Sequence, residues 1–283
     1  MGTPLHVRVK LCAIGLALLP VIANLDRVVS RAEAQETGAS CGDPLRLARS
    51  VVSIVWQYGQ PRRDGSQEIV GERATAWFYA SPRFLVTAAH FAKELPAEGW
   101  QEVELRQSSR EGEPAVAVQV RLRVTVQGKI SEGDAGGRGR DVRMAEDLAI
   151  LELQEPFQDA QILEVQPEAP SDNATVLILG YPKGQMKAAL GTIRGTEGAA
   201  SRYPGLALLE VQGSDRLLLN GGASGAPVLD CKGRVVAVLN GLLTGPSLPF
   251  LPPERSVIPT PWGSPTNTAV PVRMLESIRN RML

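Results

Sequence analysis

The stretch LNGGASGAPVLD, from Leu219 to Asp230, holds one serine, Ser224, among glycine, alanine and proline. A serine hydroxyl attacks a carbonyl carbon when a neighbouring base removes its proton. Small residues of this kind are equally typical of a tight turn. The stretch therefore predicts either a turn or a nucleophile, and the choice depends on whether a base and an acid stand elsewhere in the chain.

Histidine is the side chain that most often acts as such a base, and the 283-residue chain has only two, His6 and His90. His6 lies in an N-terminal segment with the features of an export signal, so a mature chain keeps His90 alone. His90 ends the string VTAAH, directly after an apolar run. A lone histidine is usually an ordinary structural residue, but His90 is the only imidazole available to Ser224.

The order of these residues along the chain separates the known hydrolase scaffolds. The α/β-hydrolase order needs a histidine after the serine and a glycine two residues after it, but no histidine follows Ser224, and Ala226 stands at that position. The subtilisin order belongs to an α/β scaffold, which the strand-rich pattern disfavours. The order His, Asp, Ser on a β-barrel remains. Its acid is expected at Asp147, the second residue of EDLAILEL and directly before an apolar run, although Asp147 would also suit a solvated loop end, and Asp134 and Asp141 lie in the loop before it.

The segments that must position these residues have the two-residue period of β-strands. In AVAVQVRLRVTVQ, apolar residues alternate with mostly polar ones from Val116 to Val126, which is typical of a half-buried strand. Similar apolar runs cover residues 50–57, 74–80, 83–89, 147–153, 175–181, 205–211 and 234–240. Many short strands with little helix predict an all-β sandwich or barrel. At the C-terminus, RMLESIRNRML places Leu275, Ile278 and Met282 on one face of a helix.

Two segments interrupt the strand pattern and are predicted to be loops. Residues 131–146, SEGDAGGRGRDVRMAE, are glycine-rich and charged. Residues 244–266 hold seven prolines, which lack the N–H group that a central strand needs. Loops of this length in compact domains are often functional, although the second would also suit a structural flap.

Three of these motifs resemble, in their order, the active-site signatures of trypsin-like (chymotrypsin-fold) serine peptidases: VTAAH, EDLAILEL and GGASGAPVLD. The resemblance is greatest to the bacterial HtrA-like and glutamyl-endopeptidase-like branch, to which LGYP (179–182) and TAVPVRMLESI are also similar. It implies two six-stranded antiparallel β-barrels, over about residues 45–165 and 170–275, and a C-terminal helix over about 273–283. Only 42 residues follow Gly241, and the last strand and helix need them, so no PDZ domain is expected.

The resemblance also implies a role for each residue of the motifs. Ser224 is the nucleophile, His90 is the base that takes its proton, and Asp147 holds the imidazole and stabilises the imidazolium. The backbone N–H groups of Gly222 and Ser224 form the oxyanion hole. The expected activity is that of an endopeptidase, which hydrolyses peptide bonds through an acyl-enzyme without a metal or cofactor.

By the same resemblance, the specificity pocket is expected at Leu218, Val238 and Gly241. No carboxylate stands at Leu218, which argues against a preference for Lys or Arg and leaves an apolar or small aliphatic preference. VLNG (238–241) is expected to pair with the substrate backbone as an added strand. Many relatives have an aspartate before the serine, which pairs with a freshly cut N-terminus. This chain has Ala223 there, so no activation by that salt bridge is expected.

The N-terminal residues 1–34 are predicted to be a signal peptide, which leaves a mature peptidase domain of residues 35–283. The apolar segment Leu11–Leu25 follows a basic start and is shorter than the roughly 20 residues of a membrane helix. The small residues of AEA mark a cleavage site before Gln35, with a second candidate site after Ala23. The chain is therefore expected in the periplasm or outside the cell, with the membrane as a partner only if this segment stays uncleaved as an anchor.

The mature chain keeps Cys41 and Cys231, and an even pair in an oxidising compartment predicts one disulfide, with two free thiols as the alternative. Charge is balanced at 30 basic and 30 acidic residues, which excludes a strongly basic nucleic-acid footprint. Histidine and cysteine are too few for a typical metal site. Polypeptide substrates are the expected partners. A non-catalytic peptide-binding or chaperone-like protein of the same fold, and an esterase on the same scaffold, are the rival interpretations.

Overall fold

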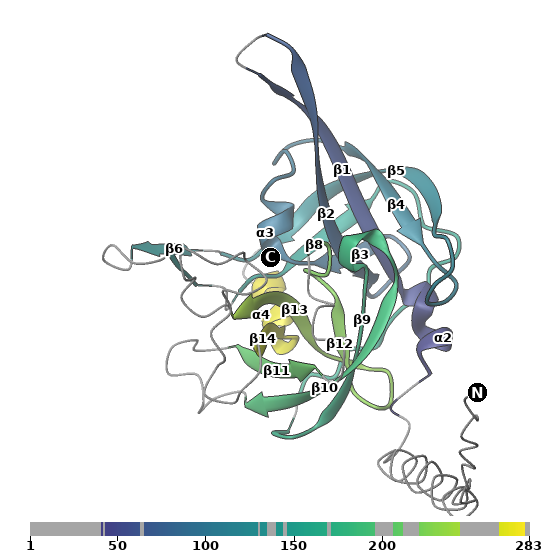
Figure 1. Ribbon diagram of the computed structural model, residues 1–283, viewed down its shortest axis with the longest axis vertical. Helices are drawn as coiled ribbons and strands as arrows, with labels where there is room; N and C mark the ends of the chain where they lie inside the picture. The colour runs from purple at the N-terminus through teal and green to yellow at the C-terminus, as the bar shows by residue number, and fades with distance from the viewer. Residues whose placement is uncertain are drawn as a thin grey trace, which may run out of the picture. The chain divides into compact units, whose positions relative to one another are not determined.

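The computed structural model describes residues 41, 43–62, 65–129, 131–134, 140–143, 146–168, 171–195, 206–211, 221–243 and 266–280. Within these residues the main strands form two closed, six-stranded antiparallel barrels, with barrel one above barrel two in the view of Figure 1. The predicted all-β fold with two barrels and a C-terminal helix is confirmed. The predicted signal peptide, residues 1–34, lies outside the described residues.

Barrel one closes in the strand order β1-β2-β3-β8-β5-β4. Its strands are β1 (Val51–Pro61), β2 (Gln67–Phe78), β3 (Phe84–Thr87), β4 (Gln101–Gln107), β5 (Val116–Gln127) and β8 (Ala149–Leu153). Alternate side chains of these strands point inward and pack together. Ile54, Phe78, Leu85 and Leu105 are fully buried in this core.

Barrel two closes in the strand order β10-β11-β14-β13-β12-β9. Its strands are β9 (Thr175–Gly180), β10 (Lys187–Gly195), β11 (Ala207–Val211), β12 (Pro227–Leu229), β13 (Val235–Leu243) and β14 (Thr266–Pro271). Its core contains buried apolar side chains from several of these strands, among them Val176, Ile193, Leu209 and Ala237.

A further cluster of buried side chains joins the two barrels. It includes Val51 and Trp77 from barrel one and Leu179 and Val238 from barrel two. Successive residues of β1 and β2 therefore alternate between the core of barrel one and the contact with barrel two. This explains why residues 51–55 and 74–78 are buried on both faces of the sheet.

The helices of the described residues are short. Helix α4 (Arg273–Asn280) buries Leu275 and Ile278 against the cluster between the barrels, on the predicted face, while Met282 lies outside the described residues. The remaining helical turns are α2 (Pro44–Leu47), η1 (Ala48–Ser50), α3 (Ala89–Ala92) and η2 (Pro182–Gly184). No helix in the described part of the chain has the length and apolar character needed to cross a bilayer.

The structure corrects two expectations about local structure. Part of the predicted loop 131–146 forms the two-stranded sheet of β6 (Ser131–Asp134) and β7 (Arg140–Arg143). Among the described strands these two pair only with each other. Their sequences, SEGD and RDVR, are mostly charged and show no apolar alternation. The first half of β5 is more exposed than predicted, because β8 pairs with β5 only from Leu122 onward and Val116 and Val118 have β4 alone beside them. The predicted loop 244–266 lies outside the described residues, except that Thr266 begins β14.

Cys41 and Cys231 form a disulfide across a sequence separation of 190 residues. The bond ties the start of the described chain to the turn between β12 and β13. Leu47 packs at the same junction, since its side chain lies 3.4 Å from the position that a Cβ atom would take at Gly233. The lead-in to barrel one is thus anchored on barrel two.

We expect the double variant Cys41→Ser/Cys231→Ser to lose about 2 to 5 kcal/mol of unfolding free energy, because the unfolded chain regains the freedom that a long covalent loop removes. Urea unfolding of the wild type with and without a reductant measures this loss. The reductant should destabilise the wild type and leave the double variant unchanged. Equal stability of all samples would contradict the prediction.

Candidate active site

His90 and Asp147 are brought together by the pairing of β3 with β8. In this antiparallel pair Thr87 lies opposite Ala149. His90 follows Thr87 by three residues and Asp147 precedes Ala149 by two, so both lie beyond the same end of the ladder. The chain leaves β3 through Ala88 and turns at once into α3, which carries His90.

The Asp147 carboxylate makes two hydrogen bonds to His90. Asp147 Oδ1 accepts the backbone N–H of His90 at 2.7 Å, and Oδ2 lies 2.7 Å from the ring atom Nδ1. The side chain of Asp147 is fully buried, whereas that of His90 is 36% exposed. The first contact ties the carboxylate to the start of the helical turn and the second fixes the ring, so Nε2 is left as the ring nitrogen free to face a reactant.

Ser224 lies in a turn wedged between β2 of barrel one and β13 of barrel two. The backbone N–H of Thr75 donates to the Ser224 carbonyl at 2.9 Å, and the N–H of Gly225 donates to the Leu239 carbonyl at 2.7 Å. The turn is therefore bonded to both barrels, with Ser224 half-buried at the junction.

Gly225 is the closest point of contact between this turn and the strand that leads to His90. Its φ of +90° is in the left-handed region, and a Cβ atom there would lie 2.1 Å from the Thr75 carbonyl oxygen and 3.0 Å from the Ala88 nitrogen. Only glycine fits this approach. Ser224 is thus held beside the turn of His90, although no hydrogen bond joins its hydroxyl to the His90 ring in this structure, as is common before a ligand binds.

Thr75 is a buried polar centre that the sequence did not single out. Its hydroxyl donates to the Gly222 carbonyl at 2.7 Å and accepts the N–H of Tyr181 at 2.9 Å, while its own carbonyl accepts the Thr87 hydroxyl at 2.7 Å. The hydroxyl of Thr75 thereby joins the serine turn to the end of β9, and its backbone carbonyl adds the strand before His90. A threonine inside an apolar run carries no sequence signal for such a role.

Tyr181, at the end of β9, also links the barrels. Its phenol oxygen accepts the backbone N–H of Ser108 at 2.7 Å, and burial raises the pKa of the phenol above its usual value. The side chain therefore stays neutral, and its hydrogen bond joins the end of β9 in barrel two to Ser108, which follows β4 of barrel one.

The backbone N–H groups of Gly222 and Ser224, which were assigned to the oxyanion hole from the sequence, have no acceptor among the described residues, and neither has that of Ala223 between them. The Gly221 carbonyl accepts the Lys183 N–H at 2.9 Å, and the Ala223 carbonyl accepts the Ala226 N–H at 3.0 Å. In a trans peptide the N–H points opposite to the preceding carbonyl. The N–H group of Gly222 therefore points away from Lys183, and that of Ser224 points away from Ala226. The φ of +103° at Gly222 lies in the region that favours glycine.

The comparison with family models identifies the family of the chain. A model described as the trypsin-like peptidase domain matches residues 74–238, more than half of the chain, and includes His90, Asp147 and Ser224. The chain belongs to the trypsin-like peptidase family. The resemblance that the three motifs indicated is therefore confirmed.

Solved structures similar to this trypsin-like peptidase domain include HtrA-type proteases. A variant of the HtrA-type protease AlgW with a decapeptide has 11% sequence identity and a TM-score of 0.55 over 83% of this chain and 65% of that one. The serine endoprotease from Yersinia pestis has 12% identity and a TM-score of 0.54 over 87% and 68%. AlgW with a decapeptide has 11% identity and a TM-score of 0.53 over 82% and 64%. The chain thus spans about two thirds of the length of these proteins, and no curated protein matches it in sequence.

The residues predicted to form the specificity pocket of this peptidase domain are only partly described. Leu218 lies outside the described residues. Val238 is fully buried in the cluster between the barrels, so its side chain lies in the core, and Gly241 is half-buried on β13. After Leu239, whose backbone bonds to Gly225 and Ala226 of the serine turn, β13 pairs with β14 alone among the described strands. Residues 241–243 therefore have a described partner strand on one side only, next to the serine turn.

Ala223 packs in the core of barrel two, where a carboxylate would be costly to bury. The hollow beside it holds only about 10 Å³, and its lining is apolar apart from Lys187. The part of the chain that the structure describes therefore offers no acidic partner here for an N-terminal amine.

Proposed function

We propose that this chain is a serine endopeptidase that uses His90, Asp147 and Ser224 as a catalytic triad. The observation that carries the proposal is the doubly bonded Asp147–His90 pair beside the serine turn, where the N–H groups of Gly222 and Ser224 have no acceptor among the described residues. Membership of the trypsin-like peptidase family supports the same reaction class.

In the proposed reaction, Ser224 Oγ attacks the carbonyl carbon of a peptide bond while His90 Nε2 takes its proton. The negative charge on the carbonyl oxygen is stabilised by the N–H groups of Gly222 and Ser224, which are in place before the reaction. The imidazolium, paired with buried Asp147, then gives its proton to the leaving amine as the carbon–nitrogen bond breaks. Water hydrolyses the acyl-enzyme by the same steps, with His90 again acting as the base.

The substrate backbone is proposed to add to the open edge of β13 as an extra strand. This edge continues from VLNG towards Leu243 and leads away from Ser224 along barrel two. The structure of AlgW with a decapeptide supports peptides as the class of ligand. Leu218 and Gly241 are retained as the proposed specificity pocket, with an apolar or small aliphatic preference, whereas the side chain of Val238 is buried between the barrels and only its strand belongs to the proposed binding edge.

The proposal places the protein outside the cytoplasm, in the periplasm or in the secreted fraction. The Cys41–Cys231 disulfide supports an oxidising compartment, and the predicted signal sequence supports export. Because Ala223 cannot form the salt bridge that activates many relatives, the domain is proposed to be competent without a new N-terminus entering barrel two.

One observation favours a second candidate, a non-catalytic peptide-binding protein of the same fold. The Ser224 hydroxyl and the His90 ring are not hydrogen-bonded to each other, so the structure has the acid–base pair assembled but not its contact with the nucleophile. A protein of this second kind would bind peptides at the β13 edge without reacting with them.

A fluorophosphonate probe distinguishes the two candidates, because it reacts with a serine only when the base and the oxyanion hole are in place. We expect residues 35–283 to be labelled, and the Ser224→Ala and His90→Ala variants to lose labelling by several powers of ten. Circular dichroism of all three proteins is the control for folding. Failure of the folded wild type to react, with and without added peptides, would contradict the triad and favour the peptide-binding protein. Profiling of a labelled protein with ester and peptide substrates then separates an esterase from a peptidase.

A further inference from the structure

Arg73 precedes Thr75 by two residues on β2, lies on the same face of the strand and is next to the serine turn. Side chains two residues apart on a strand share a face, and the Thr75 hydroxyl already contacts Gly222. The side chain of Arg73 therefore also extends towards Gly222. Its Cδ and Cγ atoms lie 3.3 and 3.5 Å from the Cβ position of Gly222, so its aliphatic stem packs directly against the proposed oxyanion turn.

The guanidinium group of Arg73 continues past Gly222 to the turn that follows β9. Its Nη1 and Cζ atoms lie 2.8 and 3.1 Å from the Cβ position of Gly184. The arginine, which belongs to barrel one, thus packs against two turns of barrel two. Gly184 and Gly222 leave the space that the side chain fills.

Arg73 has no carboxylate partner among the described residues, and its buried Nε atom has no hydrogen-bond acceptor. Most other described arginines differ, because ion pairs neutralise Arg62, Arg83, Arg106, Arg110, Arg121, Arg123, Arg194 and Arg234. A buried donor without an acceptor is costly. A ligand oxygen at this position would satisfy it.

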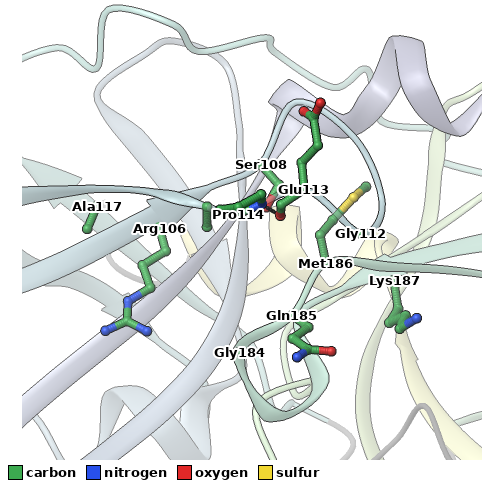
Figure 2. Close-up of a pocket in the computed structure, with 11 residues that line it drawn as sticks. Arg106, Ser108, Gly112, Glu113, Pro114, Ala117, Gly184, Gln185, Met186 and Lys187 are labelled. Atoms are coloured by element: carbon green, nitrogen blue, oxygen red, sulfur yellow. Dashed lines mark hydrogen bonds between the residues drawn. The ribbon is translucent and has the colours of Figure 1, made fainter.

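The cations that line the neighbouring cavity differ from Arg73, because they are paired with carboxylates. A pocket of about 460 Å³ lies between the turn from β4 to β5 and the turn from β9 to β10, and Figure 2 shows Gly184, Arg106 and Lys187 in its lining. Both cations already have acidic partners, since Arg106 pairs with Glu104 and Lys187 Nζ lies 3.2 Å from Glu111 Oε1. Like the exposed Lys183 in the same turn, Arg73 has no acidic partner among the described residues, and its guanidinium lies against Gly184.

The position of Arg73 relates it to one side of the bond that is cut. In the proposed function the acyl part of the substrate lies along β13 of barrel two, and the leaving amine receives its proton from His90 of barrel one. Arg73 belongs to barrel one, and its stem packs on Gly222, two residues before Ser224. In the proposed binding mode, this barrel-one side of the serine turn receives the residues that follow the cut bond.

We propose that Arg73 is a specificity-determining residue that binds a carboxylate on the leaving-group side, so that peptides with Asp or Glu at the first or second residue after the cut bond are preferred. This inference rests on the proposed function and names part of its substrate class. Arginine suits the role, because its planar guanidinium can form two parallel hydrogen bonds with a carboxylate.

The test maps the cleavage sites of denatured casein by mass spectrometry for the wild type, Arg73→Met, Arg73→Lys and Arg121→Met. Matched peptides then compare Glu with Gln at the enriched position. We expect the wild type to favour Glu about tenfold in kcat/KM, the value for a charged hydrogen bond of about 1.4 kcal/mol. Methionine keeps the stem and removes the charge, so Arg73→Met should bring the ratio near one, while Arg73→Lys should restore part of it. Arg121, paired with Glu102 on the surface, is the control and should keep the wild-type ratio.

Each outcome bears on a distinct claim. A wild-type ratio near one, or a ratio that survives Arg73→Met, overturns the assignment of Arg73 while labelling and cleavage still support the peptidase. An equal loss on both peptides in Arg73→Met means that the arginine only supports the serine turn, which also overturns it. Absence of both fluorophosphonate labelling and cleavage in the folded wild type overturns the proposed function and this inference with it.

Discussion

Replacing Asp147 by asparagine is expected to lower kcat about ten-thousand-fold while leaving the fold intact. Both carboxylate oxygens of Asp147 accept hydrogen bonds, one from the His90 backbone and one from the ring. In Asp147→Asn the amide oxygen can serve only one of these donors. If it accepts the backbone N–H, the amide NH₂ faces Nδ1, and the ring must carry its proton on Nε2. A ring in that form cannot take the proton of Ser224.

Steady-state kinetics on a peptide that the wild type cleaves measures this loss, and thermal unfolding checks that the variant remains folded. Asp172→Asn is the matched control, because Asp172 is exposed and outside the proposed site. It should retain full activity. An Asp147→Asn variant that keeps a tenth or more of the wild-type kcat would show that Asp147 does not orient the base.

Replacing Gly225 by alanine is expected to destabilise the protein by more than about 3 kcal/mol and to abolish fluorophosphonate labelling. The new Cβ would lie 2.1 Å from the Thr75 carbonyl oxygen and 2.4 Å from the Thr87 hydroxyl oxygen. Neither atom has room to yield, because both belong to the hydrogen-bonded centre between the barrels. The serine turn would have to leave its position.

Gly99→Ala is the control for this substitution. Gly99 also has a positive φ, +80°, but a Cβ atom there has nothing within 4 Å. It should therefore show only the cost of the backbone conformation, about 1 kcal/mol, with labelling retained. Urea unfolding of both variants and the wild type measures the difference. Equal destabilisation by the two substitutions would contradict a steric role for Gly225.

The sequence predicted those parts of the fold that bury one face of a strand or carry a family motif. The runs that became β3, β8 and the second half of β2 were clear, because consecutive apolar residues dominate them, whereas the more exposed first half of β2 was not predicted. Strand β12 was hidden, since Pro227 begins it and it covers only three residues. Strand β4 has only Val103 and Leu105 as buried apolar residues between polar ones, too few to establish a period.

The candidate site divides in the same way. His90, Asp147 and Ser224 could be predicted because their chemistry demands particular residue types in a particular order. Thr75 and Arg73 could not, since their importance arises from the docking of barrel two on one face of β2. No local pattern encodes a contact between Thr75 and Gly222, which are 147 residues apart.

The Cys41–Cys231 bond bears on how the proposed peptidase would survive cleavage by other copies of itself. His90, Asp147 and Ser224 all lie between the two cysteines, so one backbone cut anywhere within that interval leaves two pieces that remain covalently joined. The pieces stay at high effective concentration and re-form the packed barrels instead of diffusing apart. A molecule nicked by a neighbour thus retains all three residues on one particle, and self-digestion in a dense population removes activity only after a second event, reduction of the disulfide or a further cut.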